Sequence, residues 1–297
     1  MSQVVLVEQH SVEATAQRNA NLPLWQGAAI AALLLWLYAP TLSHLVLQWW
    51  HDPNFSHGFF VPLFSAFVLW QERSRLTALD LRPSWSGLAI LFFGLSMLVI
   101  GRWGADIFLP RLSLLIVLAG RTILFLGWNF FRAILFPWAF LLLMIPIPAI
   151  IFNKITFPLQ LLASKIASLS LAAMGVPVLR EGNVIVLAAM RLEVAEACSG
   201  IRSLMSLLTL AVIYSYLVER RTAARLALAL ASIPIAVGAN SVRIIGTGLL
   251  VQYWDPDRAE GYFHASWGLL IFVISLVMLY LVHRLICLIW PDEKEKA

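Results

Sequence analysis

The stretch EVAEACSGIRSLMSLLTLAVIYSYLV, residues 193–218, joins a short polar segment to a long apolar one. The apolar part begins at Ile201 and is long enough for a membrane helix of ~20 residues. Ser199 and Gly200 stand at its start, and both residue types are common at helix N-termini. The sequence therefore predicts that Cys198 lies at, or just before, the N-terminus of a membrane helix.

The surroundings of Cys198 favour a reactive thiolate. Unpaired backbone N–H groups and the helix dipole stabilise an anion at a helix N-terminus, and they lower the pKa of a cysteine thiol below its usual ~8.5. Arg202, one turn further on, projects from the same face and adds a positive charge. Glu193, Glu196 and Ser199 add further polar groups close to Cys198 in the sequence. The alternative is a cysteine that packs as a small apolar residue and an Arg202 that reaches up to the membrane surface.

The composition indicates a polytopic membrane protein, because 61% of the 297 residues are hydrophobic and only 12% are charged. The net charge of +5 does not indicate nucleic-acid binding, because the basic residues are scattered in short loops. Residues 1–22 lack the basic-then-apolar layout of a cleaved signal peptide, so we expect the first apolar segment to remain as an anchor. The expected organisation is a cytoplasmic tail over 1–22, a transmembrane domain over 23–290 and a cytoplasmic tail over 291–297.

The predicted fold class is all-α, with about eight transmembrane helices. The apolar segments are 27–47, 59–70, 87–101, 111–126, 133–151, 201–218, 226–251 and 265–288. Arginines cluster in the connections at 73–82 and 220–225, and the positive-inside bias places both in the cytoplasm. An even number of crossings must then separate the two connections, which holds only if residues 157–174 do not cross.

Residues 157–174 have the composition of an amphipathic or half-buried helix on the outer face of the membrane. Polar residues interrupt the apolar positions: Gln160, Ser164, Lys165, Ser168 and Ser170. Beyond Gly175 the sequence is rich in β-branched residues, with a polar turn near residues 180–183. We expect segments 178–187 and 191–194 to pair as a β-hairpin cap over the outer helix ends, shielding the thiol from water. An irregular loop is the alternative.

Two further polar residues lie near the outer end of the seventh apolar segment. Arg243 is a charge in a membrane helix, which marks a functional site by default and is expected to face the bundle interior. Asn240, three residues earlier, shares its face and can orient Arg243 or the substrate backbone. His264 stands where the outer loop enters the eighth segment. The alternatives are an arginine that reaches the headgroups and an ordinary interfacial histidine, but the predicted topology lets Cys198, Arg243 and His264 converge.

A thiolate, an arginine and a histidine together suit acyl transfer from a peptide bond. The thiolate attacks the carbonyl, the guanidinium stabilises the oxyanion or protonates the leaving amine, and the histidine shuttles protons. No cofactor or metal is expected, because the remaining histidines form no HExxH pair and the chain has neither a GxSxG elbow nor a P-loop. Cys287 is predicted near the opposite membrane face, so Cys198 should form no disulfide with it.

The sequence resembles the exosortases, multi-pass bacterial membrane proteins related to archaeosortases and analogous in chemistry to sortases. The motifs that carry the resemblance are SHGFFVPLFSAFVLW at 56–70, REGNVI at 180–185, EACSGIRSL at 196–204, ANSVRI at 239–244 and FHASWG at 263–268. The resemblance implies that Cys198 forms an acyl-thioester, that Arg243 donates a proton and that His264 stabilises the transition state. Because a guanidinium is a poor proton donor, we expect its charge to matter more than its proton.

The resemblance also implies substrates and a location. The substrates are exported proteins with a PEP-CTERM tag, a Pro-Glu-Pro-like motif followed by a membrane helix and a basic end. The enzyme is expected in the bacterial inner membrane, with its active site facing the periplasm. The expected process is protein sorting linked to exopolysaccharide. The acceptor, which can be an amine, a glycan, a lipid or water, leaves no motif.

His57 lies in the first outer loop and is a secondary candidate for substrate binding, although an ordinary histidine in an aromatic belt fits equally well. Two other functions remain open: a polytopic transporter, which needs polar groups reaching the membrane midplane from both sides, and a thiol acyltransferase with a lipid acyl donor. The sequence defines neither the subtype nor the oligomeric state.

Overall fold

The structure is a computed structural model that describes residues 24–188, 190–194, 200–254 and 262–290. It divides into two compact units. Unit 1 comprises Met1–Gln48 and Ser65–Ile145, and unit 2 comprises Trp49–Phe64 and Pro146–Ala297. The predicted tails at 1–22 and 291–297 lie outside the described residues.

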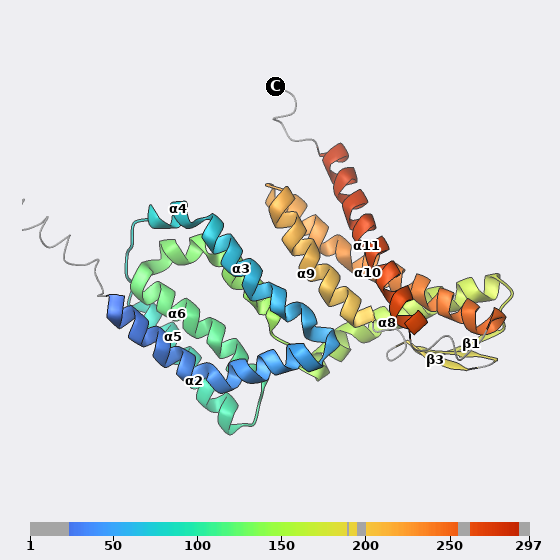
Figure 1. Ribbon diagram of the computed structural model, residues 1–297, viewed down its shortest axis with the longest axis horizontal. Coiled ribbons are helices and arrows are strands. Elements are labelled where there is room, and N and C mark those ends of the chain that lie inside the picture. The colour runs from blue at the N-terminus through green and yellow to red at the C-terminus, as the bar shows by residue number, and fades with distance from the viewer. Residues whose placement is uncertain (1–23, 189, 195–199, 255–261, 291–297) are drawn as a thin grey trace, which may run out of the picture. The chain divides into compact units, whose positions relative to one another are not determined.

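Unit 1 is built from helices. They are most of α2 (Leu24–His51), the second half of α3 (Phe60–Gln71), α4 (Arg73–Thr77), α5 (Ser86–Trp103), α6 (Phe108–Ala133), α7 (Leu135–Phe140) and the 3₁₀ helix η2 (Leu141–Met144). Helices α5 and α6 run side by side (Figure 1). The hydroxyl groups of Tyr38 on α2 and Ser113 on α6 lie 3.0 Å apart in the core of this unit.

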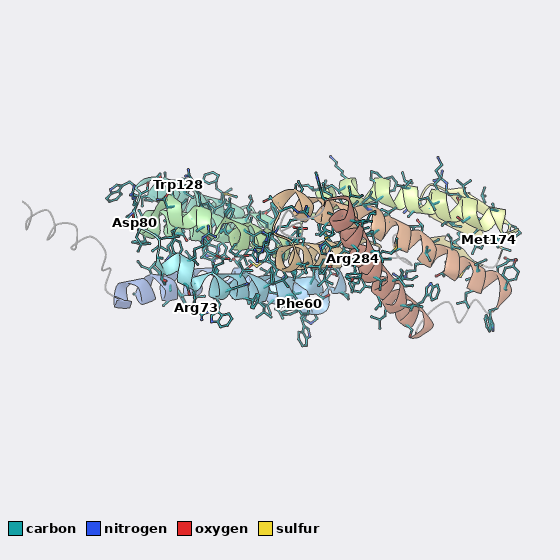
Figure 2. All side chains as sticks on the ribbon, turned by 90° about the horizontal axis from the view of Figure 1, so that it is seen from above. Phe60, Arg73, Asp80, Trp128, Met174 and Arg284 are labelled. Carbon is teal, nitrogen blue, oxygen red and sulfur yellow. The ribbon has the colours of Figure 1, made fainter. Side chains whose placement is uncertain are left out.

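The α4–α5 connection of unit 1 lies against the end of α6. The backbone N–H of Arg82 donates to the carbonyl oxygen of Leu126, at 3.3 Å. Asp80 and Trp128, which mark the two segments, are labelled close to each other in Figure 2.

Unit 2 is organised around α10. Its elements are the 3₁₀ helix η1 (Pro53–Phe59), α8 (Ala149–Ala173), three strands, α9 (Gly200–Val218), α10 (Thr222–Tyr253) and α11 (Tyr262–Ile289). Helix α10 packs against α8, α9 and α11 (Figure 1). Leu207 on α9, Leu228 and Ile235 on α10 and Leu279 on α11 form one buried core. Burial of such side chains holds the three helices together.

The strands form a small antiparallel sheet in the order β1 (Val178–Glu181), β2 (Val184–Leu187) and β3 (Arg191–Glu193). The predicted hairpin is therefore wrong in detail, because residues 178–187 form two strands instead of one. Gly182 reverses the chain between them with φ 66°, a conformation that favours glycine. The sheet packs on α8 and α10 through a second core that includes Ile185, Leu192, Leu171 and Ile244.

The chain is an all-α polytopic membrane protein, but with fewer long spans than predicted. Among the described residues, six helices are long and apolar enough to cross a membrane: Ala29–His51, Ser86–Trp103, Phe108–Ala133, Ala149–Ala173, Thr222–Tyr253 and Ser266–Ile289. The predicted segment 59–70 is the 12-residue α3. Segment 133–151 is divided between α7, η2 and the start of α8 because prolines interrupt it. Segment 201–218 is α9, a helix of 19 residues whose side chains are described from Ser203 onwards, so it is not counted among these six.

The predicted amphipathic segment 157–174 belongs to α8, which is a candidate span by length and composition. Its serine hydroxyls donate to carbonyl oxygens of their own helix, and Ser164 donates to Gly182 of the sheet at 3.0 Å. These polar side chains are thus compatible with an apolar environment as well as with water. The placement of α8 along the outer membrane face stays a prediction.

Candidate active site

The described residues include only part of the predicted site. Cys198, Glu196 and Ser199 lie outside them. Arg202 stands in the first turn of α9 and His264 in the first turn of α11, but their side chains are outside the description. The site is therefore built from Arg243 and Asn240 on α10 and from the surfaces that surround the beginning of α9.

Arg243 is half-buried on α10 and reaches towards α11. Its guanidinium carbon lies 3.5 Å from the point where a Cβ atom on Gly268 would be. Gly268 follows His264 by four residues, about one helical turn. The two helices are held close here, because a Cβ on Gly246 would lie 2.6 Å from the indole ring of Trp267. Arg243, in the interior of α10, thus lies beside the first two turns of α11, which also contain His264.

Asn240 faces a pocket between three helices. The pocket is lined by Thr156, Leu159, Gln160 and Ala163 of α8, Leu204 of α9, and Ala236, Val237 and Asn240 of α10. Asn240 is only 7% exposed, and its Oδ1 atom is buried without a hydrogen-bond partner in the described part of the chain. An unsatisfied buried carbonyl costs stability. Such an atom in a pocket wall is suited to accept a hydrogen bond from a ligand.

A second, larger pocket adjoins the first. Thr156 and Gln160 line both, and Asn153, Lys154, Phe157 and Asn183 complete the lining of the second, which encloses about 750 Å³ including the space open to solvent. Asn183 belongs to the turn between β1 and β2, so the sheet forms one wall. Lys154 is the one charged residue among the described lining. We call the first pocket, which includes Leu204 near the start of α9, the apolar chamber, and the second, which carries the cation Lys154, the polar mouth.

His57 takes a different position from the one that the sequence indicated. It lies in η1 and is only 6% exposed, so it is a buried residue and not part of an open loop. The segment η1 packs against α9, and Phe55 contacts Phe152 at a ring distance of 6.1 Å. The described lining of neither pocket includes His57. This location favours a role in holding α9 over direct contact with substrate.

The pocket residues of α8 are the functional candidates that sequence reasoning missed. From the sequence, Gln160 was only one of the polar residues that interrupt the apolar pattern of 157–174, and Thr156 and Lys154 were not selected. Lys154, Thr156 and Gln160 are spaced by two and four residues along one helix. This spacing does not indicate a pocket until α9, α10 and the sheet are placed around α8.

The site can support nucleophilic acyl transfer if a thiolate stands at the start of α9. The guanidinium of Arg243 offers planar, permanently charged donors, and Asn240 offers a buried acceptor three residues away on α10. Thr156 and Gln160 add polar groups along the pocket.

Comparison with known proteins identifies the family of the chain. Residues 49–281 match the family model described as transmembrane exosortase, which covers well over half of the chain. No curated protein and no solved structure was found to be similar. The matched region contains the first turn of α9, the pocket residues, Arg243 and His264. The chain therefore belongs to the transmembrane exosortase family, a class of membrane sorting transpeptidases.

Proposed function

We propose that this protein is a cysteine transpeptidase that cleaves the C-terminal PEP-CTERM-type sorting signal of exported proteins. In this proposal the Cys198 thiolate attacks the carbonyl carbon of the scissile peptide bond. The C–N bond then breaks, the amine leaves with a proton, and the substrate stays on the enzyme as a thioester. An acceptor nucleophile or water attacks the thioester and releases Cys198.

The observation that carries the proposal is the position of Arg243 beside Gly268. It brings the guanidinium to the first turns of α11, where His264 stands in the sequence. In this position the arginine can stabilise both the thiolate and the oxyanion that forms when the thiolate attacks. His264 or water then moves the proton to the leaving amine, because a guanidinium does not readily release one.

The two pockets support a peptide substrate. The apolar chamber suits a hydrophobic side chain near the scissile bond, and Oδ1 of Asn240 can accept a hydrogen bond from the substrate backbone. The polar mouth suits the charged part of the tag, because the Lys154 ammonium and the amides of Asn153 and Asn183 can bind a glutamate carboxylate. A pocket that binds both parts fixes the peptide relative to the nucleophile.

The proposed location is the bacterial inner membrane, with the site facing the periplasm. The support is the arginine-rich connections around Arg73–Thr77 and before Thr222, which the positive-inside bias places in the cytoplasm. The partners in this proposal are the tagged proteins, the lipid bilayer and an acceptor that is a glycan, a lipid, an amine or water. No cofactor takes part.

A cleavage assay in proteoliposomes tests the proposal. The purified protein is reconstituted with a reporter protein that ends in a PEP-CTERM tag, and the C-terminal fragment is followed by mass spectrometry. We expect cleavage with the unaltered protein and with Cys287→Ser, and no cleavage with Cys198→Ser or Arg243→Ala. Cleavage that survives Cys198→Ser would contradict the proposed nucleophile.

The same assay separates the alternatives. A transporter would move solute across the vesicle membrane without cutting the reporter. A lipid-dependent thiol acyltransferase would load Cys198 with a fatty acyl group when no reporter is present. Either result would replace the peptide-cleaving function.

A further inference from the structure

A second cluster of polar side chains lies at the C-terminal end of α9. Glu219 directly follows this helix, which is roughly 28 Å long at 1.5 Å per residue. His283 and Cys287 stand four residues apart on α11 and so share one face. Cys287 Sγ is 3.3 Å from His283 Nε2, and Glu219 Oε2 is 4.0 Å from the same nitrogen. One ligand atom from each residue lies within 4.8 Å of the others.

The carboxylate of Glu219 is fixed in place. Its Oε1 atom accepts hydrogen bonds from the backbone N–H groups of Arg220 and Arg221, at 2.9 and 3.1 Å, and Oε2 accepts one from Arg221 Nη2 at 3.1 Å. Arg221 Nε donates to Oε1 as well, at 3.2 Å, so the carboxylate and the guanidinium form an ion pair. A carboxylate oxygen has two lone pairs, and Oε2 keeps one for another ligand.

The imidazole of His283 is oriented in a way that presents Nε2 to the cluster. The Tyr214 hydroxyl lies 2.7 Å from Nδ1, while Nε2 faces the sulfur of Cys287 and the carboxylate of Glu219. His283 is 9% exposed and Glu219 is 3% exposed. A metal-binding histidine commonly has its second nitrogen held by such a hydrogen bond.

We propose that Glu219, His283 and Cys287 bind one Zn²⁺ ion. Carboxylate oxygen, imidazole nitrogen and thiolate sulfur are the three protein ligands of zinc, with bonds of ~2.0–2.3 Å that keep ligand atoms ~3.3–3.7 Å apart. Small side-chain rotations bring the cluster to that spacing. Binding displaces the proton of the Cys287 thiol, and water fills the fourth position. The ion joins the α9–α10 turn to the end of α11.

This site differs from what the sequence indicated, because no metal was expected. His283 and Cys287 form a pair at helical spacing, but two ligands alone do not define a zinc site. The third ligand lies 64 positions earlier by residue number, and only the packing of α9 against α11 brings it near. Arg284, the neighbour of His283, marks this part of α11 in Figure 2.

Cobalt absorption tests the site on the full-length protein, purified in detergent with an affinity tag that contains no histidine. After treatment with a chelator, added Co²⁺ should give a thiolate-to-cobalt charge-transfer band that saturates at one Co²⁺ ion per chain. One equivalent of Zn²⁺ should remove the band. Cys287→Ser and His283→Gln should abolish the band, and Glu219→Gln should weaken Co²⁺ binding at least ~10-fold. Cys198→Ser and His44→Gln, a change at an exposed histidine in unit 1, should leave the band unaltered.

A second measurement needs no variant. Zn²⁺ should protect Cys287 of the unaltered protein from N-ethylmaleimide, as judged by peptide mass spectrometry, and a chelator should restore the labelling. The proposal is overturned if Co²⁺ gives no saturable band, if the band survives Cys287→Ser, or if Zn²⁺ does not protect Cys287. Each of these results is independent of peptide cleavage and of Cys198. In those cases the cluster is a hydrogen-bond network that closes the end of the helix bundle.

Discussion

The guanidinium carbon of Arg243 lies 3.5 Å from the position that a Cβ atom on Gly268 would occupy. Gly268 therefore provides the space on α11 into which the arginine side chain extends. The neighbouring contact between Gly246 and Trp267 fixes the separation of the two helices at this level. Because both helices are also anchored in buried cores, the arginine is held at a defined place beside the first turns of α11.

The size of residue 268 should control the activity. Gly268→Ala places a methyl group at ordinary contact distance from Arg243 and should leave cleavage within a few-fold of normal. Gly268→Leu adds atoms where the guanidinium lies, so it should displace the arginine and lower kcat by ~10²-fold or more. Reporter cleavage under saturating substrate measures the effect.

A matched control is available on α10. A Cβ atom on Gly238 would have nothing within 4 Å in the described structure, so Gly238→Leu should fold and cleave normally. Equal losses from Gly238→Leu and Gly268→Leu would indicate general damage to the helix bundle instead of displacement of Arg243.

The charge and shape of Arg243 should both be required. Arg243→Lys keeps the charge but loses the planar donor geometry, so it should be severely impaired yet detectable. Arg243→Ala should lose at least ~10²- to 10³-fold in rate. In Arg243→Ala, the pH midpoint of Cys198 alkylation should rise towards that of a free cysteine, because a stabilising charge has been removed. An unchanged midpoint would confine Arg243 to steps after thiolate formation.

Asn240 should improve substrate binding without adding to the stability of the fold. Asn240→Leu removes a buried carbonyl oxygen that has no partner in the described structure, so the free energy of unfolding should stay the same or rise by about 1–3 kcal/mol. The same change should raise KM, because the substrate loses its hydrogen-bond acceptor. Thermal unfolding in detergent and substrate titration measure the two effects. A variant that is less stable and has an unaltered KM would assign Asn240 a purely structural role.

Some of the fold follows directly from sequence pattern. The long apolar segments that became α6, α10 and α11 were predicted because a helix needs about 20 apolar residues to cross a bilayer. The break near residues 145–148 was not predicted, because the prolines there end one helix and begin another inside a continuous apolar stretch. Gly182 likewise forms a turn within the segment 178–187, which was predicted to be a single strand.

The candidate site was predictable only where a residue is unusual in its own segment. Arg243 stands out because a charge is rare in a membrane helix. Thr156 and Gln160 do not stand out, because polar residues on α8 fit a water-facing surface equally well, and only the packing of α9 and α10 turns them into a pocket wall. The Glu219–His283–Cys287 cluster was not predicted either, because only the packing of the helices brings its three residues together.

The membrane orientation is a separate prediction. The arginine clusters predict that both termini and the connection between α9 and α10 are cytoplasmic. Reporter fusions at Asp80 and Asp255 measure this directly. The Asp80 fusion should be active only as a cytoplasmic reporter and the Asp255 fusion only as a periplasmic one. A cytoplasmic signal at Asp255 would reverse the orientation of the site.

The central claim is that Cys198 carries the substrate as a thioester. Cys198→Ala should be nearly silent for folding, because it removes one sulfur atom at a position that the sequence predicts to be a helix end, where no large cavity would result. It therefore serves as the blank for a trapping experiment, in which the protein is incubated with a tagged substrate, quenched in acid and digested.

The decisive measurement is the mass of the Cys198 peptide after this quench, in the unaltered protein and in slowed variants such as Arg243→Lys. We predict a mass increase equal to the N-terminal part of the cleaved substrate, removable by hydroxylamine and missing in Cys198→Ala. A Cys198 peptide that stays unmodified while the substrate is cut, or one that carries a fatty acyl group instead, would contradict the account.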